Sequence, residues 1–105
     1  MHQMRISLEG LQIIDAIQRR GSFAAAAEEL FRVPSTITYA VQKLEEDLGF
    51  PLFQRNGHRP RLTPAGEEVL KEGRLILQAT VDLEERAKRV SEGYEARLPI
   101  ALDGL

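Results

Sequence analysis

The sequence contains no cysteine and no tryptophan, and only 6% of its 105 residues are aromatic. Without cysteine the chain cannot form a disulfide, a thiolate nucleophile or a zinc finger. No apolar run approaches the ~20 residues that a membrane-spanning helix needs, and no signal peptide precedes the first apolar repeat. We therefore expect a cytoplasmic protein without membrane contact, built as one domain or one domain with an extension.

The formal net charge of −2 is small, but the charges are unevenly distributed. Residues 1–62 carry eight Lys and Arg against seven Asp and Glu, whereas residues 63–105 carry six against nine. Arg55, Arg59 and Arg61 stand close together with no acidic residue among them. A local group of cations attracts a polyanion whatever the total charge, so the composition does not exclude nucleic acid as a partner.

Two short helices are predicted before residue 34. Ser7 is the expected N-cap of the first and Gly21 its expected end. Its apolar positions are spaced three residues apart, at Leu8, Leu11, Ile14 and Ile17. Ser22 is the expected N-cap of the second helix, whose four consecutive alanines let a neighbouring helix approach closely.

The segment from Pro34 to about Leu48 predicts a third helix with two different faces, followed by Gly49 as a left-handed end. The buried stripe is formed by Ile37, Val41, Leu44 and Leu48. The opposite face carries hydrogen-bonding groups and a single cation, at Ser35, Thr36, Tyr39, Gln42 and Lys43. Such a polar, acid-poor front is what a DNA-reading helix-turn-helix requires. The alternative for Tyr39 and Lys43 is a solvent-exposed side chain without a role in binding.

Two short extended segments are predicted on either side of the turn at Asn56-Gly57, the first over residues 50–55 and the second over 61–63. A hairpin after a helix-turn-helix is a wing, and its arginines are candidates for phosphate contact. His58 is expected to be a neutral turn residue and not a metal ligand.

Thr63 and Pro64 predict the start of a fourth helix that runs to about Ser91, before Gly93. Its apolar and small residues alternate at spacings of four and three, and Leu77 broadens the stripe. The positions are Val69, Gly73, Ile76, Thr80, Leu83, Ala87 and Val90. This repeat predicts a seam that pairs two chains into a homodimer, after first turns that pack on their own domain. Residues 98–102 predict an extended strand without a partner, as expected of a fragment.

The acidic residues Glu67, Glu68 and Glu72 do not indicate an active site. They lie near the start of the fourth helix, where negative charge is favourable, and no nucleophile or set of metal ligands accompanies them. The sequence therefore predicts neither an enzyme nor a cofactor or metal site.

Several motifs together resemble the N-terminal domain of LysR-type transcriptional regulators, over about residues 6–95. The matching residues are Gly21-Ser22-Phe23, Ala26-Ala27 with Leu30, Leu44-Glu45 with Leu48-Gly49, Pro51-Leu52-Phe53 with Arg55, and Leu62-Thr63-Pro64-Ala65-Gly66. The resemblance implies a mainly α fold with a winged helix-turn-helix at residues 1–62, made of three helices and a small β-hairpin. It further implies a long linker helix at 63–93 that dimerises antiparallel, and at 94–105 the start of a missing effector-binding domain.

The function implied by the resemblance is sequence-specific binding of double-stranded DNA at a pseudo-palindromic operator by a homodimer. A tetramer is implied for the full-length protein, and a small-molecule effector would bind only to the missing domain. The alternative from another class is a winged-helix adaptor that binds protein and pairs through the long helix. The arginine-bearing wing and the acid-poor front of the third helix argue against that alternative.

The expected contacts follow from the residues and the resemblance together. Bases and the major groove are assigned to Pro34, Ser35, Thr36, Thr38, Tyr39 and Gln42. Phosphates and the wing are assigned to Ser22, Lys43, Arg55, Arg59, Arg61 and Thr63. The chain departs from the family at Val33-Pro34, where a serine cap and then glutamine is frequent, and at Thr38-Tyr39, where a serine-arginine pair is common. We therefore expect different operator bases from those of better-known relatives.

Overall fold

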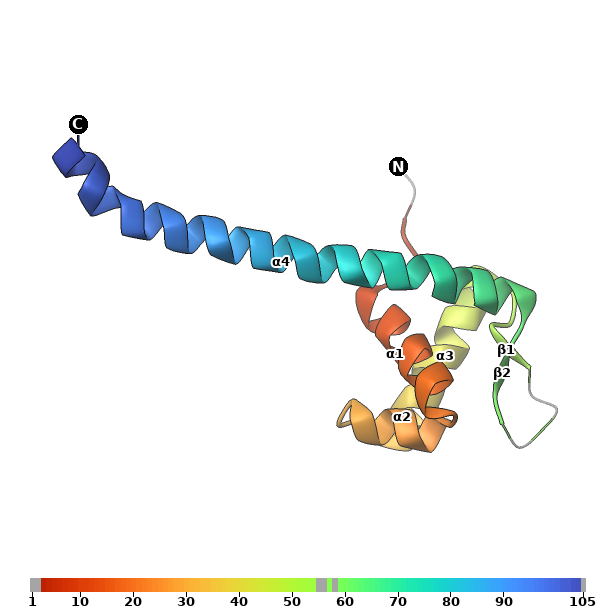
Figure 1. Cartoon of the computed structure of the whole chain (residues 1–105). Helices are drawn as coiled ribbons and strands as arrows, with labels where there is room; N and C mark the ends of the chain where they lie inside the picture. The colour runs from red at the N-terminus through yellow and green to blue at the C-terminus, as the bar shows by residue number, and fades with distance from the viewer. Residues whose placement is uncertain (1–2, 55–56, 58, 105) are drawn as a thin grey trace.

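Three helices form the body of the protein (Figure 1). The computed structural model describes residues 3–54, 57 and 59–104, and of those from 94 onward only the backbone. The helices are α1 (Leu8–Arg20), α2 (Phe23–Glu29) and α3 (Pro34–Leu48). The hydroxyls of Ser7 and Ser22 cap α1 and α2, each accepting from the backbone N–H three residues on at 3.0 Å. Gly21 and Gly49, with φ of 87° and 90°, end α1 and α3 in the left-handed conformation. The caps predicted at Ser7 and Ser22 and the ends predicted at Gly21 and Gly49 are confirmed.

The hydrophobic core lies where these three helices meet the hairpin and the start of the fourth helix. Its buried members are Ile13, Ile14, Ala16, Ile17, Ala26, Ala27, Ile37, Val41, Leu44, Leu52, Phe53 and Leu70. Ala26 and Ala27 are at most 1% exposed, and their small side chains let α2 pack directly on both neighbours. Packing of this kind is the reason that a helix of seven residues can be stable in this position.

Of the four apolar positions of the repeat in α1, Leu8 is 45% exposed and the other three are buried. A spacing of three residues falls about 60° short of a full turn each time, so the repeat winds around the helix. By Ile17 the drift reaches about half a turn, and Leu8 therefore points away from the core. Ile13 and Ala16, which the repeat passes over, are buried in its place.

The hairpin pairs β1 (Phe53–Gln54) with β2 (Arg61–Leu62) in antiparallel register, Phe53 opposite Leu62. The predicted wing is therefore confirmed; we use "wing" for residues 53–62. The Phe53 ring is buried and meets the ring of Phe23 edge-on, with centroids 5.7 Å apart. This contact attaches the wing to α2. Arg55, Asn56 and His58, named in the sequence analysis, lie outside the described residues.

The base of the wing is also fixed by the start of α4 (Pro64–Gly104). The Thr63 hydroxyl donates to the carbonyl of Pro51 at 2.8 Å and accepts from the N–H of Gly66 at 3.0 Å. A Cβ on Gly66 would lie 2.1 Å from the carbonyl oxygen of Leu52, so no larger residue fits there without displacement of the backbone. The wing and α4 are thus held together at one corner of the domain.

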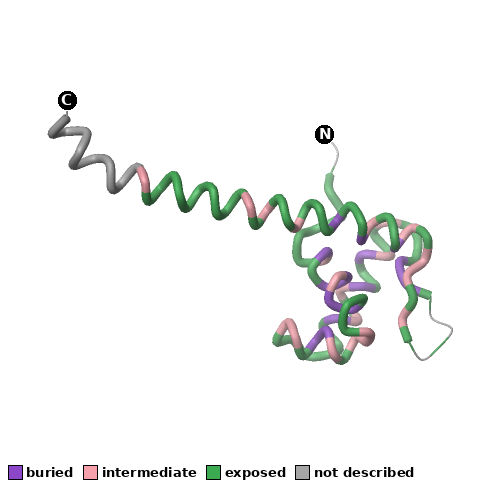
Figure 2. The backbone as a smooth tube through the Cα atoms, in the orientation of Figure 1, coloured by how far each residue is buried: buried purple, intermediate pink, exposed green. Residues whose placement is uncertain are grey.

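The first turns of α4 pack across α1, and the rest of the helix projects from the domain as a single rod (Figures 1 and 2). Leu70 is buried in the core, and a Cβ on Gly73 would lie 2.7 Å from Cδ2 of Leu11. The absence of a side chain at Gly73 therefore permits the close crossing of α1 and α4. From residue 81 to 92 every residue except Asp82 is exposed.

The predicted end of this helix is wrong. The helix does not stop before Gly93 but continues to Gly104, and residues 98–102 are helical where an extended strand was expected. A single glycine inside a helix costs only about 1 kcal/mol, too little to end it by itself. Pro99 removes a backbone N–H, yet a helix can pass through an isolated proline with a local distortion.

Candidate nucleic-acid interface

The buried stripe of α3 fixes the direction of its exposed face. Ile37 and Val41 are at most 1% exposed and Leu44 is 7% exposed, so this side is anchored in the core. Tyr39 is 65% exposed, and Gln42 is exposed as well. The predicted orientation of the helix is therefore correct: its aliphatic side faces inward, and its tyrosine and glutamine face outward.

Charge along the exposed face of α3 changes from one end to the other. Between Pro34 and Gln42 there is no charged residue, and the side chains of Ser35 and Thr36 are exposed. Acidic residues begin at Glu45, with Glu46 and Asp47 exposed in the last turn. Lys43 lies between the two regions and pairs with Asp47 at 3.6 Å. Only the first half of the helix therefore presents an uncharged polar surface that a polyanion can approach without repulsion.

Thr38 differs from the other predicted contact residues because it is half-buried. It lies one position after Ile37, closer to the buried stripe than Tyr39 or Gln42 does. Its hydroxyl has less room than those of Ser35 and Thr36 to meet a groove.

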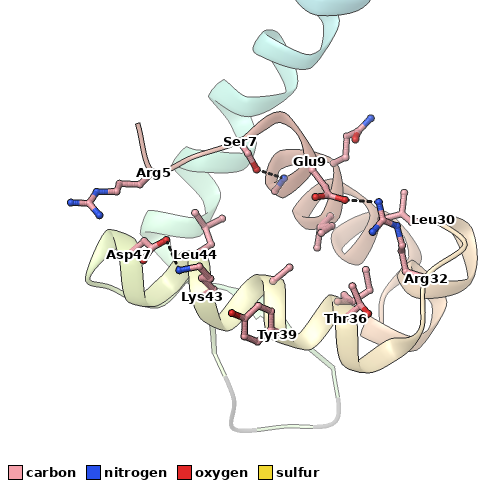
Figure 3. Close-up of a pocket in the computed structure, with 15 residues that line it drawn as sticks. Arg5, Ser7, Glu9, Leu30, Arg32, Thr36, Tyr39, Lys43, Leu44 and Asp47 are labelled. Carbon is pink, nitrogen blue, oxygen red and sulfur yellow. Dashed lines mark hydrogen bonds and ion pairs between the residues drawn. The ribbon is translucent and has the colours of Figure 1, made fainter. Parts of the chain in front are cut away.

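A hollow of about 540 Å³ lies along one flank of α3, between that helix and the start of α1 (Figure 3). Tyr39, Thr36 and Lys43 line it from α3, and Arg5 and Arg32 from the other side. The Arg32 guanidinium is bound by the Glu9 carboxylate at 2.6 Å. The hollow is therefore bordered by part of the exposed face of α3 and by side chains of both charges.

The two hydroxyls predicted at phosphate-holding helix starts are already engaged within the chain. Ser22 Oγ accepts the N–H of Ala25, and Thr63 Oγ1 accepts the N–H of Gly66. Thr63 lies against the wing base, where its hydroxyl also donates to the carbonyl of Pro51. Their predicted contacts to DNA remain predictions.

The wing presents Arg59 and Arg61, both exposed. Arg61 lies on β2 opposite Gln54. The base of the wing packs in the same core as α3, because Leu52 and Phe53 are buried there. Two of the three predicted wing arginines are thus on the described part of the wing, and Arg55 is outside the described residues.

The residues predicted to pair two chains divide into two groups along α4. Val69 packs against the core, Gly73 faces Leu11, and Leu77 is half-buried, so these are used within the chain. The others lie on the projecting rod and are unburied or half-buried: Ile76, Thr80, Leu83, Ala87 and Val90. Leu83 is 59% and Val90 69% exposed. Large apolar side chains with this exposure are typical of a surface that another chain covers.

An ion-pair chain connects α4 to the helix-turn-helix. Asp15 on α1 accepts from Arg74 Nε on α4 and from Arg19 Nε, both at 2.8 Å, and Arg19 also binds Glu29 on α2. Partial burial pushes the pKa of the Asp15 carboxyl upward, but the hydrogen bonds from both arginines outweigh it and the pKa lies below its ordinary value. The Arg19 hydrogen bond likewise lowers the pKa of Glu29.

One residue beside the candidate interface was not among the predicted site residues. Glu45 was named only as part of a family motif, yet its carboxylate binds the backbone of the wing base. The available signal was its place on α3: it lies one residue from Leu44, beside the buried stripe, where a solvated acid is not expected.

Within the described residues no three His, Cys, Asp or Glu side chains gather as metal ligands would. No helix in the described part of the chain is long and apolar enough to cross a membrane.

The fold and this surface place the chain in a known family. The profile described as bacterial regulatory helix-turn-helix protein, lysR family, matches residues 8–67. The chain therefore belongs to the lysR family of bacterial regulatory helix-turn-helix proteins, and the family and fold expected from the sequence are confirmed.

Among curated proteins, the probable HTH-type transcriptional regulator YhaJ of Escherichia coli (strain K12) is 48% identical over 100 residues, covering 95% of this chain and 34% of that protein. The regulator PunR of the same strain is 42% identical over 95 residues, covering 90% and 31%. The chain spans about a third of the length of these curated relatives.

Two solved structures are similar in fold and contain DNA. The crystal structure of the BenM_DBD/catB site 1 DNA complex gives a TM-score of 0.81 at 26% identity, covering 85% of this chain and 96% of that one. The crystal structure of the CbnR_DBD-DNA complex gives 0.75 at 31% identity, covering 82% and 99%.

Proposed function

We propose that this chain is the DNA-reading part of a transcription regulator that binds a pseudo-palindromic operator as a homodimer. The observation that carries the proposal is the first half of α3, an uncharged polar surface held outward by a buried aliphatic stripe. A helix of this kind fits the major groove of B-DNA, where its first residues meet base edges. Tyr39 and Gln42 are then the base-reading residues, supported by Pro34, Ser35, Thr36 and Thr38.

The wing supports the same function from the side. Arg59 and Arg61 stand exposed on a hairpin whose base packs in the same core as α3, so they would meet the DNA backbone once α3 occupies the groove. We assign Arg55 to the same role from its place in the sequence. The likeness to two DNA-bound domains of the family supports this arrangement.

The projecting part of α4 supports a dimer. Its exposed apolar residues, among them Leu83 and Val90, would be covered by the same helix of a second chain. In such a dimer the α3 helices of the two chains would enter successive major grooves about 34–36 Å apart. The family resemblance implies an interrupted palindrome with a T and an A framing eleven bases.

Effector binding and higher assembly belong to the whole regulator. By comparison with its relatives, this chain spans about a third of such a protein. A small-molecule effector, and assembly into a tetramer, would act through regions outside these residues. A regulator that binds DNA in this way works in the cytoplasm.

Titration of a mixed-sequence duplex by fluorescence anisotropy at low salt tests DNA binding directly. If Lys43, Arg55, Arg59 and Arg61 each meet a phosphate in both subunits, the slope of log K against log salt is about −7. A slope shallower than about −2 would contradict this interface. Selection of bound fragments from genomic DNA would then give the operator.

A further inference from the structure

A carboxylate of α3 binds the backbone where the wing begins, in addition to the core contacts of Leu52 and Phe53. Oε2 of Glu45 accepts the backbone N–H of Leu52 at 2.7 Å and that of Phe53 at 3.2 Å. Glu45 is half-buried in the second half of α3, and the two amides belong to fully buried residues at the base of the wing. A side chain of α3 is therefore hydrogen-bonded to the backbone from which the wing begins.

The hairpin itself does not supply partners for these amides. The carbonyl of Leu52 accepts from Thr63 N–H at 2.9 Å, which closes the ladder at this end. The carbonyl of Thr63, which a longer ladder would offer to Leu52, accepts from Glu67 N–H at 2.8 Å as part of the first turn of α4. Because α4 begins here, the outward amides of the wing base need an acceptor from another element, and Glu45 provides it.

We propose that Glu45 is a positioning residue for DNA binding, which sets the wing relative to α3 so that Arg59 and Arg61 reach the backbone while α3 occupies the major groove. The inference rests on the proposed function. Glu45 would not touch DNA itself. Its effect passes through the two hydrogen bonds to the wing base, which are strengthened by the negative charge of the acceptor.

If only charge mattered, removal of Glu45 would be expected to strengthen DNA binding instead of weakening it. An acidic residue close to a polyanion weakens binding, so the loss of Glu45 should strengthen the complex if charge were its only contribution. Its neighbour Glu46 has the same charge and lies exposed on the front of α3. Glu46 is therefore a matched control in which the charge effect acts without the hydrogen bonds to the wing.

The experiment compares Glu45→Ala and Glu45→Gln with Glu46→Ala and Glu46→Gln in the 105-residue chain. Binding to a mixed-sequence duplex of about 30 base pairs, long enough for two half-sites, is measured by anisotropy over a range of salt concentrations. We expect Glu45→Ala to weaken binding about tenfold, with a slope shallower by ~0.9 for each phosphate contact that the wing gives up. Glu45→Gln retains an acceptor oxygen and should lie between Glu45→Ala and wild type.

Both Glu46 variants should bind as wild type does or more tightly. If Glu45→Ala binds as tightly as its Glu46 counterpart, with an unchanged slope, Glu45 has no positioning role. If the wild-type chain does not bind the duplex at all, the proposed function fails and this inference with it, so the two failures are distinguishable.

Amide hydrogen exchange supplies a readout that does not depend on DNA. The N–H groups of Leu52 and Phe53 should exchange faster in Glu45→Ala than in wild type, while the amides of α3 at Ile37 and Val41 stay protected. Unchanged protection at the wing base would contradict the attachment. If Glu45→Ala proves too unstable to fold, the Glu45→Gln and Glu46→Gln pair decides the sign of the effect.

Discussion

Single side chains on α3 divide cleanly between holding the helix and facing outward. Ile37, Val41 and Leu44 are buried in the core, and Tyr39 projects from the opposite side with 65% of its surface exposed. Truncation of an outward residue therefore tests recognition with little effect on folding, whereas truncation of an inward one tests folding first.

Tyr39→Ala and Gln42→Ala should each reduce affinity for the selected operator by ~1–3 kcal/mol and affect mixed-sequence DNA little. The reason is that contacts to base edges are lost on the operator only. Anisotropy titrations on both duplexes give the two values. Equal losses on both would assign these side chains to the DNA backbone.

Gly66 offers a test of the corner where the wing meets α4. Gly66→Ala places a Cβ against the carbonyl of Leu52, and we expect a loss of about 1–3 kcal/mol in the free energy of unfolding. Gly93→Ala is the matched control, because nothing lies within 4 Å of a Cβ there and alanine is the better helix former. Urea denaturation of both variants measures the contrast. A Gly66→Ala protein as stable as wild type would show that the corner can relax.

At the scale of elements, the ion-pair chain connects α4 to α1 and α2 beside the apolar contacts of Leu70 and Gly73. Asp15 joins Arg74 of α4 to Arg19 of α1, and Arg19 reaches Glu29 of α2. Three helices that share the apolar core are therefore also linked by charges. Each link is partly exposed to solvent, so its contribution is modest.

The free energy of unfolding should depend on pH through Asp15. Because the pKa of Asp15 is lowered from 3.8 on folding, its contribution is complete above that value and is lost as the pH falls through the lower, folded pKa. Asp15→Asn should therefore reduce stability at neutral pH by about 1 kcal/mol and flatten the loss of stability below about pH 4. Thermal melts from pH 2 to 7 measure both effects. Non-additivity with Arg74→Gln would confirm the pair, and strict additivity would contradict it.

At the scale of the whole molecule, the exposed apolar residues of α4 should determine the oligomeric state. Leu83→Lys places a charge in the predicted seam and should weaken the dimer at least about a hundredfold, because the ammonium would be buried without a partner. Gln78→Lys adds the same charge about half a turn away from the seam and should leave the dimer intact. Sedimentation of both variants measures the difference. A Leu83→Lys protein that remains dimeric would refute the seam.

Local signals were sufficient for most of the fold. The caps at Ser7 and Ser22 and the left-handed ends at Gly21 and Gly49 depend on neighbours a few residues away, and each was predicted correctly. The error at the end of α4 has a local cause as well, because Gly93 was given more weight as a helix end than its energy justifies.

The contacts that set the geometry of the candidate site could not be predicted in this way. Glu45 meets the wing only because the chain reverses after Gly49, and Arg74 is 59 residues from Asp15 in sequence. Neither pairing follows from a periodicity, since both depend on how separate elements are placed in space. The outward face of α3 was predictable because one helix determines it, whereas the attachment of the wing to α3 was not.

The part of α4 that projects from the domain limits how the spacing of the DNA sites bound by such a protein can change. Each residue added to a rod of this kind advances its end by about 1.5 Å and also rotates it by about 100°. In the proposed dimer, a one-residue insertion in the projecting part would turn the apolar stripe relative to the DNA-binding domain of each chain, so only steps of about seven residues, close to two turns, preserve the alignment of the two domains. The distance between the two half-sites can then drift only in coarse increments of roughly 10 Å, and operators for regulators of this build should fall into discrete size classes.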